Sequence, residues 1–109
     1  MFKEDKFLWT NHARDKMRYY RLTESRLKRI IRHPARTEEA VLEGAVACMQ
    51  LSEGKKYSEI WVMYVIINLK RKAINAKQIK IITAWRYPGK SPARDPIPAE
   101  ILREVKNIL

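Results

Sequence analysis

The sequence predicts one α+β domain, with helices packed on one face of a sheet of four or five mostly antiparallel strands. Apolar residues recur with helical spacing in residues 12–33 and again in residues 97–109. Residues 58–67 and 78–87 are rich in β-branched and aromatic side chains, which favour strands. A chain of 109 residues that is 46% hydrophobic can bury one core, so we expect a single domain.

Two helices are expected near the N-terminus. The apolar run at residues 7–10 is typical of a strand or an extended entry, after which Thr10 or Asn11 can cap a helix over about residues 12–20.

The second expected helix begins after Thr23 and ends before Pro34, because proline cannot continue a helix. Leu22 and Leu27 flank the capping Thr23 as a hydrophobic staple does.

Strands are expected in the middle of the chain. Gly44 predicts the turn of a hairpin whose second strand is residues 45–51. Residues 58–67 are apolar in both alternating sets, which indicates a central strand covered on both faces. Residues 70–77 are basic and turn-like.

Residues 78–87 form the last expected strand, and residues 1–88 form the α+β part of the domain. Prolines predict that residues 89–96 are a linker. Residues 97–109 are expected to form an amphipathic C-terminal helix that belongs to the same domain. The expected alternation of the last strand puts Ile79, Ile81, Thr83, Trp85 and Tyr87 on one face and Lys80, Ile82, Ala84 and Arg86 on the other.

The net charge of +11 is unevenly distributed: residues 12–36 carry +7 and residues 37–53 carry −4. A basic folded surface predicts a polyanionic partner, because each neutralised phosphate releases counterions. An acidic protein or anionic lipid is an alternative, although the second helix lacks the large apolar face of an interfacial membrane helix. The residues expected to contact nucleic acid are Arg14, Arg18, Tyr19, Arg21, Arg26, Lys28, Arg29 and Arg32.

Several classes of protein are disfavoured. The single cysteine, Cys48, cannot close an intramolecular disulfide, so we expect a cytoplasmic protein. The longest apolar run, residues 60–67, is far shorter than a membrane-spanning helix. The chain has two histidines and no Gly-rich phosphate loop, so we expect neither a metal nor another cofactor.

Several short motifs in the chain form a recognisable pattern: His12-Ala13, Lys16-Met17, Leu22-Thr23, Pro34, Ile82 to Trp85 and Tyr87-Pro88. Through these motifs the chain resembles the small bacterial proteins grouped as the domain of unknown function 4258 family, over about residues 7–88. The arginine that usually precedes the methionine in that family is Lys16 here. The resemblance implies a fold like that of RelE-type ribonuclease toxins.

Metal-independent RNA cleavage needs a base, an acid and a cation beside the phosphate. His12 and Lys16 are four residues apart, so they share one helix face and are the first catalytic candidates. Arg86 and Tyr64 are the candidates from the strands. The structural alternatives are a His12 that lies near the helix cap and a Tyr64 that packs in the core.

The function that these patterns favour is RNA binding by a RelE-like toxin type of protein, with metal-independent cleavage of mRNA or ribosome-associated RNA. One alternative is a non-catalytic nucleic-acid-binding module. Another is a regulator whose C-terminal helix binds a protein such as an antitoxin.

Overall fold

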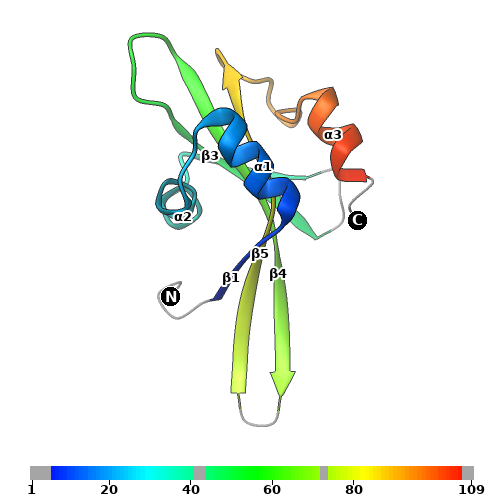
Figure 1. The fold of residues 1–109 in the computed structure, drawn as a ribbon. Helices are drawn as coiled ribbons and strands as arrows, with labels where there is room; N and C mark the ends of the chain where they lie inside the picture. The colour runs from blue at the N-terminus through cyan, green and yellow to red at the C-terminus, as the bar shows by residue number, and fades with distance from the viewer. Residues whose placement is uncertain (1–5, 41–43, 72–73, 107–109) are drawn as a thin grey trace.

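The computed structural model describes residues 6–40, 44–71 and 74–106, and this part of the chain forms five strands and three helices (Figure 1). The expected α+β class is confirmed. The elements in chain order are β1 (Lys6–Trp9), α1 (Asn11–Tyr20), α2 (Glu24–Arg32), β2 (Arg36–Glu39), β3 (Ala45–Leu51), β4 (Ser58–Arg71), β5 (Ile74–Pro88) and α3 (Ala99–Lys106).

The strands form one sheet in the order β1-β5-β4-β3-β2. All neighbours pair antiparallel except β1, which pairs parallel with β5 at one edge. The mostly antiparallel sheet is therefore confirmed, with one parallel pair. The hairpin predicted at Gly44 joins β2 to β3, and Gly44 has a φ of 80°, which favours glycine. Residues 41–43 of its turn lie outside the described residues.

Both N-terminal helices begin after threonines that the sequence predicts as caps. Thr10 Oγ1 accepts a hydrogen bond from the Ala13 N–H at 3.0 Å, and Thr23 Oγ1 accepts one from the Arg26 N–H at 3.1 Å. These bonds satisfy N–H groups that have no partner within the helix. The Thr10 hydroxyl also lies 2.9 Å from the Ile81 carbonyl oxygen, so it attaches the start of α1 to β5.

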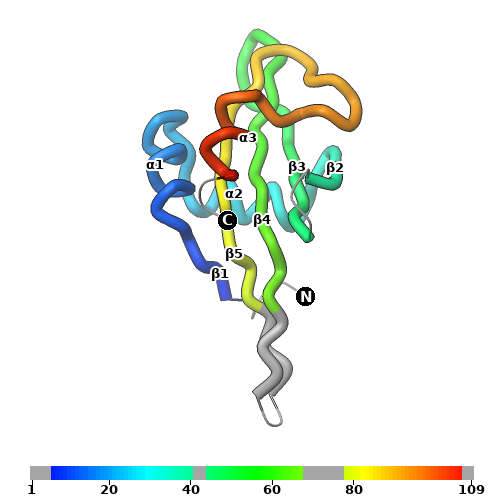
Figure 2. The backbone as a smooth tube through the Cα atoms, turned by 90° about the vertical axis from the view of Figure 1, so that its right-hand side faces the viewer, coloured from blue at the N-terminus to red at the C-terminus, as the bar shows by residue number. Residues whose placement is uncertain are grey.

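Helices cover both faces of the sheet (Figure 2). On one face, Met17 of α1 and Leu27 of α2 are buried against β4 and β5. On the other face, Ile101 and Val105 of α3 are buried in a cluster with Trp61. The expectation of helices on one face is therefore wrong for α3. Because β4 is apolar on both faces, a second layer must exclude water from it.

A β-bulge in β5 breaks the alternation that the sequence predicts. Met63 pairs with Thr83, while the next residue of β4, Tyr64, pairs with Ile81. Ile82 is therefore an extra residue without a partner across the pair, as in a bulge.

The bulge changes which side chains of β5 share a face. Ile81 and Ala84 both pack with α1 and α2, whereas Ile82 and Trp85 pack in the cluster with α3. The predicted faces of this strand are wrong for this reason. The shift leaves Arg86 on the side of α1 and α2, where it contacts the last turn of α1.

The β4–β5 hairpin is longer than expected. β4 continues to Arg71 and β5 begins at Ile74, so the prediction of a turn over residues 70–77 is wrong. Residues 72–73 lie outside the described residues. Beyond Val65, β4 pairs only with β5 among the residues described, and Figure 1 shows the hairpin extending past the other strands.

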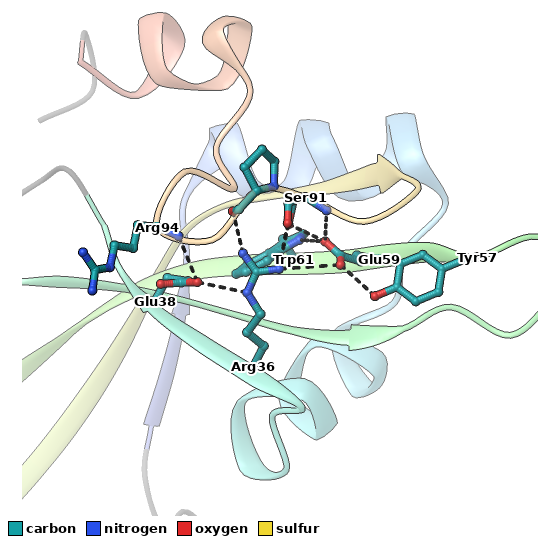
Figure 3. Close-up of polar contacts among 8 residues, drawn as sticks. Arg36, Glu38, Tyr57, Glu59, Trp61, Ser91 and Arg94 are labelled. Carbon is teal, nitrogen blue, oxygen red and sulfur yellow. Dashed lines mark hydrogen bonds and ion pairs between the residues drawn. The ribbon is translucent and has the colours of Figure 1, made fainter.

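The segment after β5 is attached to the sheet by a buried carboxylate (Figure 3). Glu59 of β4 is fully buried and accepts hydrogen bonds from Trp61 Nε1 at 2.9 Å, Ser91 Oγ at 2.6 Å and the Tyr57 hydroxyl at 3.0 Å. Arg36 Nη1 lies 3.7 Å from Glu59 Oε2. Burial raises the pKa of Glu59, but the hydrogen bonds outweigh burial and hold this pKa below its usual value.

Arg36 of β2 completes the attachment. Its Nη2 donates to the Pro92 carbonyl at 2.7 Å, its Nη1 to the Ser91 carbonyl at 3.1 Å, and its Nε to Glu38 at 2.9 Å. Residues 89–96, expected as a linker, are therefore bound to β2 and β4 and lead α3 onto its face of the sheet.

Candidate nucleic-acid interface

A groove of about 740 Å³ lies between α2 and the neighbouring end of the sheet. We call it the arginine groove, because five arginines and a single carboxylate are among the residues that line it. Its lining residues are Arg21, Leu22, Thr23, Ser25, Arg26, Arg29, Arg32, His33, Ser52, Glu53, Ile60 and Arg86.

The spacing of residues on α2 explains this composition. Arg26, Arg29 and His33 follow one another at intervals of three and four residues, so they lie along one side of the helix. Leu27 and Ile30 lie on the other side of the helix, where they pack against the sheet and are fully buried. The same amphipathic pattern therefore docks α2 and points its basic side into the groove.

Arg21 lies where α1 ends and the groove begins. Its backbone is left-handed, with φ 59° and ψ 52°, and its N–H is bonded to the Arg18 carbonyl at 3.3 Å. Arg21 also lines a second hollow of about 410 Å³ together with Arg14 and Arg18. The two hollows share Arg21, so the basic surface continues from the groove onto α1.

The candidate arginines differ in their partners. Arg14 forms an ion pair with Glu24 at 3.1 Å, and Arg18 forms one with Asp15. These pairs partly neutralise the second hollow. Within the described part of the chain, no ion pair involves Arg21, Arg29 or Arg32.

Two expected nucleic-acid contacts do not line either hollow. Lys28 Nζ lies 5.1 Å from the centre of the Phe7 ring, at the β1 side of α2. Tyr19 is 76% exposed, and its ring lies 5.7 Å from Lys16 Nζ. The eight expected contacts therefore divide between the groove, the second hollow and separate parts of the surface.

The catalytic candidates His12 and Lys16 face α3. Lys16 Nζ lies 2.9 Å from Glu104 Oε1, and His12 Nδ1 lies 3.7 Å from Glu104 Oε2. Burial lowers the pKa of His12, while the charge of Glu104 opposes that effect. His12 Nε2 is buried and has no hydrogen-bond partner in the described structure. This pair is thus engaged with a carboxylate and does not line the arginine groove.

The two strand candidates also lie in different surroundings. Tyr64 is only 8% exposed and belongs to the core under α1 and α2, where burial raises its pKa. Arg86 lines the arginine groove. The structure therefore brings Arg86 to Arg26 and Arg29 and does not assemble His12, Lys16, Tyr64 and Arg86 into one site.

His33 lines the groove but was not among the residues expected to bind nucleic acid or to act in catalysis. Its spacing of seven residues from Arg26 was an available signal. Ser52 and Glu53 carried no such signal, since a loop has no periodicity that would indicate the direction of a side chain.

Other kinds of site have no support in residues 6–40, 44–71 and 74–106. They contain no group of three His, Cys, Asp or Glu residues that could hold a metal ion. No helix among them is long and apolar enough to cross a membrane. Cys48 is buried, and burial raises the pKa of its thiol to about 12, as expected for a small core residue rather than a nucleophile.

Comparisons with protein-family models, with curated proteins and with solved structures find no match to this chain. The resemblance to the domain of unknown function 4258 family and to the RelE-type fold therefore stays a prediction.

Proposed function

We propose that this protein binds RNA by its phosphate backbone in the arginine groove. The observation that carries the proposal is the lining itself, in which five arginines meet one carboxylate, Glu53. Arginine is suited to this role because its planar fork can donate two parallel hydrogen bonds to one phosphate. Arg21, Arg29 and Arg32 have no ion-pair partner among the described residues, so their charge is available to a ligand.

The shape of the basic surface favours a chain of phosphates over a single small anion. α2 has nine residues, and at 1.5 Å of rise each it spans about 13 Å. The second hollow extends the surface further through Arg21. A basic groove of this kind can follow the backbone of a single strand. The family resemblance supports RNA over DNA, and mRNA or ribosome-associated RNA over other RNAs.

The proposal is tested by the dependence of binding on salt. For single strands, each phosphate contact contributes about 0.7 to the slope of log affinity against log salt. The double variant Arg29→Gln with Arg32→Gln removes two such contacts and should therefore reduce this slope by about 1.4, measured by fluorescence anisotropy with a labelled single-stranded RNA.

The matched control is Arg103→Gln with Lys106→Gln, which removes the same charge from exposed positions of α3. Equal slopes for the two double variants would refute the groove as the RNA site. A labelled DNA of the same sequence tests the choice of nucleic acid, and equal affinity for both would remove RNA selectivity from the proposal.

Cleavage of the bound RNA is a second candidate function, and it rests on one observation. His33 lines the same groove as Arg86, and imidazole is the commonest general acid–base group in enzymes. Incubation with RNA in EDTA should then give 2′,3′-cyclic phosphate ends, and His33→Ala should abolish them. The same assay with His12→Ala tests the original candidate. Intact RNA throughout would leave a binding protein without nuclease activity.

A protein partner on the C-terminal helix has less support. Ile101 and Val105 of α3 are buried on the chain's own sheet, so these two apolar side chains of the described part of the helix are not available to a partner. The RNA proposal takes the protein to be cytoplasmic, as the single cysteine predicts.

A further inference from the structure

We infer that Arg26 and Arg86 form a clamp for one phosphate group within the arginine groove, and that the other groove arginines attract the backbone through charge alone. The inference rests on the proposed function and specifies where the groove binds most selectively. It depends on the hydrogen bonds that hold the two guanidinium groups. No other arginine that lines either hollow has its guanidinium group held in this way within the described structure.

The two guanidinium groups donate hydrogen bonds to three consecutive residues, of which two end β3 and the third follows it. Arg26 Nη1 donates to Gln50 Oε1 at 2.9 Å, and its Nη2 donates to the Leu51 carbonyl at 2.9 Å. Arg86 Nη1 donates to Ser52 Oγ at 3.2 Å. Their acceptors on these residues are successive in the chain, both arginines line the groove, and the positive charge of Arg86 acts on Arg26.

All of these acceptors are neutral. Arg86 Nε donates to a fourth one, the Tyr20 carbonyl, at 2.9 Å. Each guanidinium therefore uses two of its five N–H donors for positioning, and its charge is not cancelled by a carboxylate. Arg14 and Arg18, by contrast, are oriented by acids. The remaining donors of Arg26 and Arg86 can bind an anion with little further loss of side-chain freedom.

The surroundings of Arg26 disfavour its positive charge, and a bound anion would counter this effect. Burial is the main cause that lowers its pKa, and the positive charges of Arg29 and Arg86 add to it, while Glu53 acts in the opposite sense. No ion pair joins Glu53 to Arg26 or Arg86 among the described residues. A phosphate between the two arginines would supply the missing negative charge.

Gln50 is the positioning residue of the clamp. Its Nε2 donates to the His33 carbonyl at 2.8 Å, which fixes the orientation of the amide so that Oε1 faces Arg26. Gln50 thus joins the end of α2 to β3 and holds Arg26 at the same time. Arg29 and Arg32 have no comparable support within the described structure.

Lysine substitutions distinguish an arginine that binds phosphate through two hydrogen bonds from one that attracts it through charge alone. Arg26→Lys and Arg86→Lys keep the charge but lose the bidentate fork, so each should weaken binding of a single-stranded RNA about tenfold or more. Arg29→Lys and Arg32→Lys should each change the dissociation constant by less than about threefold. Thermal unfolding of every variant identifies any loss of folding.

A measurement on the unmodified protein removes the dependence on variants. Inorganic phosphate titrated into the labelled protein should shift the NMR signals of the Arg26 and Arg86 Nε–H groups with one common saturation curve. The corresponding signals of Arg29 and Arg32 should move little. Equal, unsaturable shifts at all four arginines, or equal losses in all four lysine variants, would overturn the clamp.

The source of the phosphate is decided by two RNAs that differ only at the 5′ end. If the 5′-phosphorylated RNA binds more tightly than the 5′-hydroxyl RNA, and Arg26→Lys removes the difference, the clamp binds a terminal phosphate. If both bind equally and both are weakened by Arg26→Lys, the clamp binds an internal diester. Binding of both RNAs with no special loss in Arg26→Lys and Arg86→Lys rejects the clamp and keeps the groove. No RNA binding at all rejects the proposed function.

Discussion

Lys16 Nζ of α1 lies 2.9 Å from Glu104 Oε1 of α3, so one ion pair joins helices that cover opposite faces of the sheet. His12 adds a longer contact to the same carboxylate, at 3.7 Å. The side chain of Glu104 is 39% exposed, and solvent therefore screens the pair. The buried side chains Ile101 and Val105 contribute more to the docking of α3 than this ion pair does.

Glu104→Gln should consequently have a small effect on stability. We expect the free energy of unfolding to fall by about 0.5–1 kcal/mol, because the ion pair is screened and the apolar contacts of α3 remain. Urea denaturation measures the change. The control is a double-mutant cycle with Lys16→Gln, in which Glu104→Gln should cost less in the absence of Lys16 than in its presence. A loss of several kcal/mol in Glu104→Gln would show that the ion pair, and not the core, holds α3.

The buried carboxylate of Glu59 makes stability dependent on pH. Its pKa in the folded protein lies below the ordinary glutamate value of 4.5. A lowered pKa means that the carboxylate stabilises the fold fully above about pH 4.5, and that this contribution is lost as the pH falls through the folded pKa. Glu59→Gln should cost about 3 kcal/mol at neutral pH, because Arg36 and four hydrogen-bond donors lose a charged partner.

The same variant provides the test. Urea denaturation between about pH 7 and pH 3 should show the difference between unmodified protein and Glu59→Gln shrinking as the solution becomes acidic. A difference that stays constant over this range would contradict the assignment of the acid sensitivity to Glu59. Ser91→Ala, which removes one donor to the carboxylate, should show a smaller loss in the same direction.

At Arg21, the left-handed backbone should make a glycine variant more stable than an alanine variant, which is the reverse of the usual order within helices. At a φ of 59°, a residue with a Cβ atom is strained, and glycine is not. Arg21→Gly should therefore be more stable than Arg21→Ala by about 1 kcal/mol in thermal or urea unfolding. Both variants remove the same charge, so the comparison isolates the backbone. Greater stability of the alanine variant would mean that this turn is not left-handed in solution.

Cys48 should be chemically inert in the folded protein. Its thiol is buried, its pKa is raised to about 12, and its Sγ lies 3.8 Å from the Ile30 carbonyl oxygen to which it donates. A thiol reagent at mildly alkaline pH should react only after urea unfolds the chain, because the nucleophilic thiolate is not formed in the core. Rapid labelling of the native protein would indicate that β3 opens next to α2.

The sequence predicted the elements whose signals are local. Thr10 and Thr23 were recognisable as caps because a hydroxyl before a helix bonds to an N–H within three residues. The apolar pattern of residues 58–67 also predicted correctly that β4 is covered on both faces. The second face of β4 is covered by α3. The sequence did not predict this packing, because α3 lies far from β4 along the chain.

The candidate site was less predictable because it depends on relations between distant elements. That α2 is basic followed from the charge of residues 12–36, whereas the face on which Arg86 lies depends on the bulge at Ile82. A bulge adds one residue without changing the composition of the strand, so the alternating pattern did not reveal it. His12 was named as a catalytic candidate because of its spacing from Lys16, and only the tertiary structure places His33 in the groove.

The position of β1 beside β5 has a consequence for the order of folding. Thr10 bonds to carbonyl groups 71 and 72 residues further along the chain, at Ile81 and Ile82. Contacts of such long range close slowly, because the loop between them must first lose its freedom. During synthesis the arginines of α2 emerge early, yet Arg86 can reach them only after β5 has been made. The nascent chain would therefore acquire a complete arginine groove only late in its production.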